Sequence, residues 1–66
     1  MQLTVNGQPQ TIGDGATLEA LLSALALAPR RVAVERNGQL VRRADFAQTP
    51  LHEGDCLEIV TLVGGG

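Results

Sequence analysis

The chain has 66 residues and a formal net charge of −2, with five arginines, seven acidic residues and no lysine. So short a chain forms one domain with a small core that cannot supply the walls of a deep catalytic cleft. We therefore expect a module that presents a surface or a chemical handle, and not an enzyme. Phe46 is the only aromatic residue, so the stacking rings and basic groove of a single-strand nucleic-acid binder are missing.

Cys56 is the only cysteine, which excludes an intramolecular disulfide and a two-cysteine metal site. We interpret it as a small, inert, half-buried hydrophobe in a strand, and we predict no metal site. The opening MQLTVNGQPQ has no basic region followed by an apolar core, and no apolar run approaches the ~20 residues that span a bilayer. These features predict a cytoplasmic protein with no membrane partner.

Residues 1–12 predict a β-hairpin. Met1, Leu3 and Val5 alternate with polar residues, as in a strand with one buried face. Asn6-Gly7 is typical of a two-residue hairpin turn, and the return strand that follows contains Pro9, which predicts that it lies at a sheet edge.

The next segment predicts one amphipathic helix of roughly two to three turns. Thr17 stands at the N-cap position, and Ala28-Pro29 marks the stop because a residue before proline avoids helical geometry. Apolar side chains recur at i, i+3, i+4 and i+7 and form one stripe toward the core: Leu18, Leu21, Leu22 and Leu25.

The second half of the chain predicts short strands. Residues 32–35 form a strand, Asn37-Gly38 a turn and residues 39–41 a short return strand. Segment 42–50 is irregular, with a helical turn around Asp45 and Phe46. With a final strand at 56–63, these elements predict an α+β fold, in which one main helix covers one face of a mixed four- to five-stranded sheet.

The final strand carries a candidate docking surface. Leu57 and Ile59 share the face that we expect to pack on the helix. The opposite face presents apolar and acidic side chains close to the end of the chain, a composition typical of docking surfaces: Glu58, Val60 and Leu62. The alternative is that segment 42–50 covers this face.

Gly64-Gly65-Gly66 closes the sequence, and we predict a folded domain at 1–63 with a flexible tail at 64–66. Fully extended, the tail reaches roughly 10 Å at about 3.5 Å per residue, and without side chains it can enter a narrow channel of a partner. The carboxylate of Gly66 is then the working group. It needs activation, most simply as an acyl-adenylate made from ATP, before a sulfide equivalent can displace AMP and leave a thiocarboxylate. On its own, a glycine triplet is more typical of a frayed end or a cloning scar than of a functional tail.

Four segments in fixed order resemble the thiamine-pathway sulfur carrier family, ThiS. They cover nearly the whole chain: MQLTVNGQ, TLEALLSAL, VAVERNGQLV and HEGDCLEIVTLVGGG. The most specific feature is Gly54-Asp55 followed by an apolar strand and a final glycine pair. The resemblance implies a ubiquitin-like β-grasp fold.

The resemblance also implies a mechanism and partners. An adenylating enzyme related to ubiquitin-activating enzymes uses MgATP to form an adenylate at Gly66, while this chain binds no cofactor itself. A sulfur donor such as a cysteine desulfurase supplies persulfide sulfur, which converts Gly66 to a thiocarboxylate. Thiazole synthase then receives the tail, with Gly64 and Gly65 threading its active site.

Other functions stay open at this point. Within the carrier class, they are sulfur supply for molybdopterin, cysteine or tRNA thiolation. A ubiquitin-like modifier joined through Gly66 fits the tail equally well. A β-grasp RNA-binding or regulatory module does not explain the tail and would survive deletion of Gly65 and Gly66.

Three further sets of residues carry weaker hypotheses. One is a basic cluster around the Asn37-Gly38 turn, either a solvated rim or a patch that steers toward an acidic partner: Arg36, Arg42 and Arg43. A second is an acidic set near the tail that could pair with a basic groove: Glu53, Asp55 and Glu58. His52 is interpreted as a surface residue.

Overall fold

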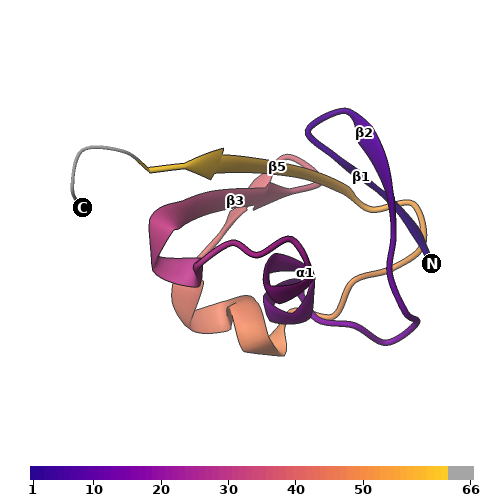
Figure 1. Cartoon of the computed structure of the whole chain (residues 1–66), viewed down its shortest axis with the longest axis horizontal. Coiled ribbons are helices and arrows are strands. Elements are labelled where there is room, and N and C mark those ends of the chain that lie inside the picture. The colour runs from indigo at the N-terminus through magenta and orange to yellow at the C-terminus, as the bar shows by residue number, and fades with distance from the viewer. Residues whose placement is uncertain (63–66) are drawn as a thin grey trace.

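The computed structural model describes residues 1–62 (Figure 1), so the predictions on residues 63–66, including the boundary between domain and tail, lie outside the described residues. The elements are, in chain order, β1 (Gln2–Val5), β2 (Gln8–Thr11), α1 (Leu18–Ala24), the 3₁₀ helix η1 (Pro29–Arg31), β3 (Val32–Arg36), β4 (Gln39–Val41), the 3₁₀ helix η2 (Arg43–Gln48) and β5 (Cys56–Thr61).

The strands form one mixed sheet in the order β2-β1-β5-β3-β4. The first and last strands of the chain pair in parallel, with Thr4 opposite Cys56 and Val5 opposite Leu57, whereas the other neighbours are antiparallel. In Figure 1, α1 and η2 lie on the same side of this sheet, which leaves the other side open. The expected α+β class is confirmed, with five strands.

Both Asn-Gly turns are confirmed. Asn6 and Gly7 have φ angles of 51° and 80°, and Asn37 and Gly38 have 52° and 84°. Positive φ at both central residues is the geometry of the type I′ turn, whose twist suits the strands that it joins. Pro9 lies in β2, which is an edge strand as predicted.

Helix α1 begins where the sequence predicts and ends earlier. The hydroxyl of Thr17 accepts the Ala20 N–H at 3.2 Å, which satisfies one free amide of the first turn. At the other end, Ala26 takes a φ of 59°, and the Leu27 N–H donates to the Leu22 carbonyl at 2.9 Å. This bonding closes the helix in a Schellman cap. The predicted stop at Ala28-Pro29 is therefore wrong, and Pro29 instead begins η1.

The core lies between the sheet, α1 and η2. The leucine stripe is confirmed, since three of its members are buried and Leu25 packs against them. Phe46 of η2 is 2% exposed, and the amide of Leu18 donates to the carbonyl of Thr49 at 2.9 Å. Segment 42–50 thus packs beside the helix. It does not cover the open face of the sheet, as the alternative interpretation required. The remaining buried apolar residues come mainly from the strands: Leu3, Val5, Val32, Val34, Leu51, Leu57 and Ile59.

Candidate functional site

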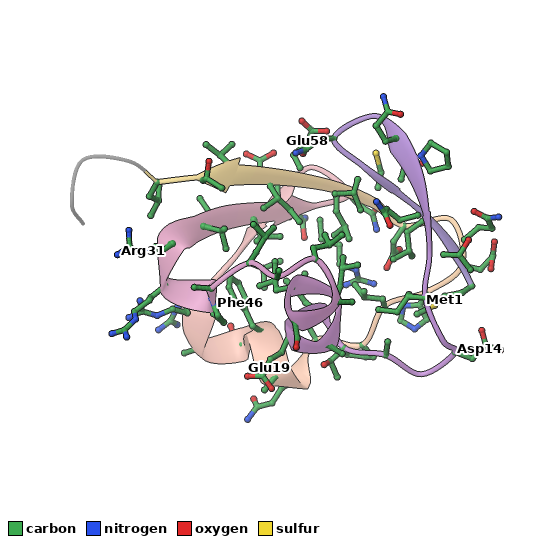
Figure 2. All side chains as sticks on the ribbon, in the orientation of Figure 1. Met1, Asp14, Glu19, Arg31, Phe46 and Glu58 are labelled. Carbon is green, nitrogen blue, oxygen red and sulfur yellow. The ribbon has the colours of Figure 1, made fainter. Side chains whose placement is uncertain are left out.

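The open face of β5 carries the predicted docking residues. Leu57 and Ile59 are buried on the helix side, at 0% and 7% exposure. Val60 is 60% exposed and Leu62 is 49% exposed, although both are apolar. Figure 2 shows Glu58 on the side of the sheet away from α1 and Phe46. The structure therefore brings Glu58, Val60 and Leu62 to one exposed strip along β5, as the alternation of the sequence predicts.

The same face holds two carboxylates directly opposite each other. Glu35 of β3 pairs with Glu58 of β5 in the antiparallel register, and both are exposed. Like charges at directly opposite positions destabilise a sheet. On the other side of Glu35 lies Leu40 of β4, which is 70% exposed. A destabilising acidic pair beside an exposed apolar side chain suits contact with a partner better than it suits the isolated fold.

The second half of β5 is held on the β1 side by one amide side chain. Asn6 donates from Nδ2 to the Ile59 carbonyl at 2.9 Å, and its Oδ1 accepts the Ile59 N–H at 2.7 Å. β1 itself pairs with β5 only through Thr4 and Val5. The side chain of Asn6 therefore makes the two hydrogen bonds to Ile59 that a further residue of β1 would make if that strand continued. The sequence indicated the turn at Asn6 but gave no sign of this contact.

The start of β5 is fixed by Asp55, which is 6% exposed. Its Oδ2 accepts Arg36 Nε at 2.9 Å and the His52 backbone N–H at 2.8 Å, while its Oδ1 accepts Asn37 Nδ2 at 3.0 Å. Burial opposes ionisation, but the hydrogen bonds from Asn37, His52 and Arg36 outweigh it and hold the pKa of this carboxyl below its ordinary value. This network joins the β3–β4 turn to β5.

Two predictions about charges are corrected by this network. Asp55 and Glu53 lie before β5, at the opposite end of the strand from the tail. Asp55 is buried against Arg36, and Glu53 Oε1 accepts the Gln2 N–H at 3.0 Å. Of that acidic set only Glu58 lies on the exposed face of β5. The predicted basic cluster is also wrong. Arg36 lies at the turn and binds Asp55, whereas Arg42 and Arg43 follow the other end of β4.

Cys56 and His52 have local structural surroundings. The prediction that Cys56 is half-buried is wrong: it is exposed, because it opens β5 on the open face of the sheet. Its N–H donates to Asn37 Oδ1 at 2.9 Å. His52 is exposed as predicted, and its Nδ1 lies 3.0 Å from a terminal nitrogen of Arg36. Among residues 1–62, neither side chain has a chemical partner that indicates catalysis.

Within residues 1–62, no three histidine, cysteine or acidic side chains come together as metal ligands. No helix in that part of the chain is long and apolar enough to cross a membrane. The remaining predicted site residues, Gly64, Gly65 and Gly66, lie outside the described residues.

The sequence was compared with protein-family models, and the model of the ThiS family matches residues 3–66. The chain belongs to the ThiS family. The match runs from β1 through the three final glycines, so it includes the residues that the resemblance identified as the working end.

Relatives of two kinds match this ThiS-family chain. The sulfur carrier protein ThiS of Thermus thermophilus is 32% identical over 62 residues, which cover 94% of this chain and 95% of the relative. A thiazole synthase of Paramagnetospirillum magneticum is 44% identical over 66 residues. This chain spans only 20% of the length of that thiazole synthase.

The solved structures give the same fold. The crystal structure of the thiamine biosynthesis protein ThiS from Geobacter metallireducens superposes with a TM-score of 0.84 at 40% identity, covering 100% of both chains. The β-grasp fold is confirmed: a mixed five-stranded sheet with one main helix on one face.

Proposed function

We propose that this ThiS-family chain is the sulfur carrier of thiamine biosynthesis and works through the carboxylate of Gly66. The observation that carries the proposal is the family match, which extends through Gly66. The name of the Thermus relative, sulfur carrier protein, supports the same role. The chain acts as a substrate and donor for other enzymes, and the proposed compartment is the cytoplasm.

The chemistry at Gly66 takes three steps: adenylation, sulfur transfer and release of the thiocarboxylate. In the first, the carboxylate attacks ATP in the partner enzyme, forming an acyl-adenylate and releasing pyrophosphate. In the second, the terminal sulfur of a persulfide attacks the acyl carbon and AMP leaves. A second thiol then attacks the donor's sulfur in this acyl disulfide, which forms a new disulfide with the donor and releases the thiocarboxylate. Gly64 and Gly65 suit this route because a strip without Cβ atoms passes through a narrow channel.

Three partners follow from this chemistry. An adenylating enzyme binds MgATP and activates the Gly66 carboxylate, since this chain is too small to build a nucleotide site of its own. A sulfur donor such as a cysteine desulfurase supplies the persulfide. Thiazole synthase is the proposed acceptor, supported by the Paramagnetospirillum relative, a longer protein with that name whose sequence includes a region similar to this chain.

The proposed docking surface for the adenylating enzyme is the exposed strip of β5. Val60 and Leu62 supply apolar area at the end of the strand that leads toward Gly66, and Glu58 adds a negative charge. A partner that contacts this strip would hold the tail at its channel entrance. Apolar residues that are exposed in the free protein and buried on docking are favourable anchors.

A reconstituted sulfur-transfer assay tests the function. The chain is incubated with MgATP, the adenylating enzyme, a cysteine desulfurase, cysteine labelled on sulfur, and thiazole synthase with its other substrates. We expect label in the thiazole product with the full chain and none after deletion of Gly65 and Gly66. Stable adducts between Gly66 and lysines of other proteins, without labelled thiazole, would instead indicate a ubiquitin-like modifier.

A further inference from the structure

Four of the five arginines lie in or directly before the two 3₁₀ helices, η1 and η2. Arg30 and Arg31 lie in η1, directly before β3, and Arg31 is seen in Figure 2 beside the end of β5. Arg42 and Arg43 follow β4, whose last residue pairs with Val34 in the middle of β3, and η1 contacts η2. We call these four residues the arginine collar.

Arg30 and Arg31 of the arginine collar lie beside the last residues of β5. Thr61 ends β5 opposite Val32, the residue that follows Arg31. The amide of Leu62 then donates to the carbonyl of Arg31 at 2.7 Å. The charged side chains of η1 and the exposed apolar side chain of Leu62 are therefore parts of one surface at the base of the tail.

The collar arginines have no counter-charges in the described part of the chain. All four are exposed, and neither of the ion pairs found within residues 1–62, Met1 to Asp14 and Arg36 to Asp55, includes one of them. Asp45 of η2 is the only acidic residue in η1 or η2, and it forms no ion pair in that range either. A chain of net charge −2 thus carries a concentrated positive end.

We propose that the arginine collar docks on a rim of carboxylates around the entrance of the adenylating enzyme's tail channel. This inference rests on the proposed function, because it assigns a partner surface to the tail. Arginine pairs with carboxylates through two parallel hydrogen bonds, so the collar arginines can orient the docked carrier as well as attract the partner. The collar also raises the encounter rate when the partner carries the opposite charge.

Protein carboxylates fit this surface better than a nucleic acid does. Single-strand binders add stacking rings to their positive groove, and the only aromatic residue, Phe46, is buried in the core. The apolar neighbours Val60 and Leu62 also suit a protein contact, in which an apolar centre is surrounded by a charged rim.

The test compares carriers in the adenylation reaction, followed by pyrophosphate release at varied carrier concentration and salt. The variant Arg30→Gln/Arg31→Gln/Arg42→Gln/Arg43→Gln should lower kcat/KM at low salt by about tenfold or more, with kcat little changed, because steering acts on association. The wild-type kcat/KM should fall as salt rises, and that of the variant should depend on salt much less. The collar side chains donate no hydrogen bond within residues 1–62, so the variant should fold.

A matched control distinguishes the effect of where the arginines lie from the effect of the total net charge. Arg30→Gln/Arg31→Gln lowers the net charge by the same amount as Gln8→Glu/Ala20→Glu, which changes exposed residues of β2 and α1. The first pair should lower kcat/KM and the second should not. Equal effects of the two pairs on kcat/KM, or an unchanged salt dependence in the fourfold variant, would contradict the proposed role of the arginine collar in docking. So would binding of a labelled single-stranded RNA that the fourfold variant loses while its adenylation stays normal. If the wild-type chain itself is not adenylated, the proposed function fails instead.

Discussion

The side chain of Asn6 forms a two-way hydrogen-bonded contact with the backbone of Ile59, at 2.7 Å to its N–H and 2.9 Å to its carbonyl. The two residues are 53 positions apart. One side chain therefore serves both the first turn of the fold and the strand that leads toward the glycines.

Replacing Asn6 with Gly should lower the free energy of unfolding by about 1–3 kcal/mol, because Ile59 loses both partners on that side. Glycine keeps the positive φ of the turn, so the loss reports the side chain. Chemical denaturation measures it. Asn6→Asp keeps an acceptor for the Ile59 N–H but cannot donate to the Ile59 carbonyl, so it should also destabilise the fold. A loss of a few tenths of a kcal/mol in Asn6→Gly would show that solvent replaces the contact.

The two Asn-Gly turns show which features of the fold can be predicted from the sequence and which cannot. Asn6-Gly7 and Asn37-Gly38 predicted both hairpins correctly, because the required positive φ angles favour Asn and Gly in any context. The same asparagines also bind β5 through their side chains. Those bonds depend on how distant segments meet in space, and no local pattern encodes them.

Asp55→Asn should destabilise the fold by about 1–3 kcal/mol. The neutral amide cannot match the charge of Arg36, and its NH₂ group competes with the donors that surround the carboxylate. Asp45→Asn is the matched control, since Asp45 is exposed and its side chain has no hydrogen-bond partner within residues 1–62. Urea midpoints of the two variants measure the difference. Equal midpoints would mean that the Asp55 network adds no stability.

The same residue predicts a pH dependence. Because the folded pKa of Asp55 lies below its ordinary value of 3.8, the unfolded chain binds the proton more readily. The stability that Asp55 contributes is complete above the ordinary pKa and is lost as pH falls below it through the folded pKa. The difference in unfolding free energy between wild type and Asp55→Asn should therefore shrink from about pH 5 to about pH 2. A difference that stays constant over this range contradicts the assignment.

Glu58→Gln should stabilise the free protein and weaken its use by the adenylating enzyme. Removing one charge of the Glu35–Glu58 pair should raise the free energy of unfolding by about 0.2–1 kcal/mol. The loss of a contact charge should raise the KM for the carrier. Glu19→Gln on α1 serves as a control for net charge and should leave the KM unchanged. Lower stability in Glu58→Gln would show that the pair is not repulsive.

Val60→Ser tests the docking surface. Val60 is 60% exposed, so its replacement should change the free energy of unfolding by no more than about 0.5 kcal/mol. If Val60 is an anchor, the KM for the carrier should rise by about fivefold to thirtyfold, which corresponds to about 1–2 kcal/mol. Leu40→Ser, at an exposed apolar residue of β4, should have a smaller effect. A KM that rises equally in both variants would place the contact centre away from β5.

The candidate site could be predicted from the sequence only where the two-residue period of a strand determines which face a side chain occupies. The alternation of β5 correctly placed Glu58, Val60 and Leu62 on the open face, because a strand fixes sides by sequence spacing. The grouping of charges was not predictable in this way. Arg36 was assigned to Arg42 and Arg43 by closeness in sequence, whereas the antiparallel β3–β4 pairing separates them and brings Arg30 and Arg31 toward the end of β4.

The most direct test of the central claim is an intact mass spectrum of the chain after incubation with MgATP, the adenylating enzyme and a sulfur donor. We expect a mass gain equal to one exchange of oxygen for sulfur, located at Gly66 by fragmentation, with one AMP released per chain converted. An unchanged mass, with an adenylating enzyme shown to be active on another carrier, would contradict it.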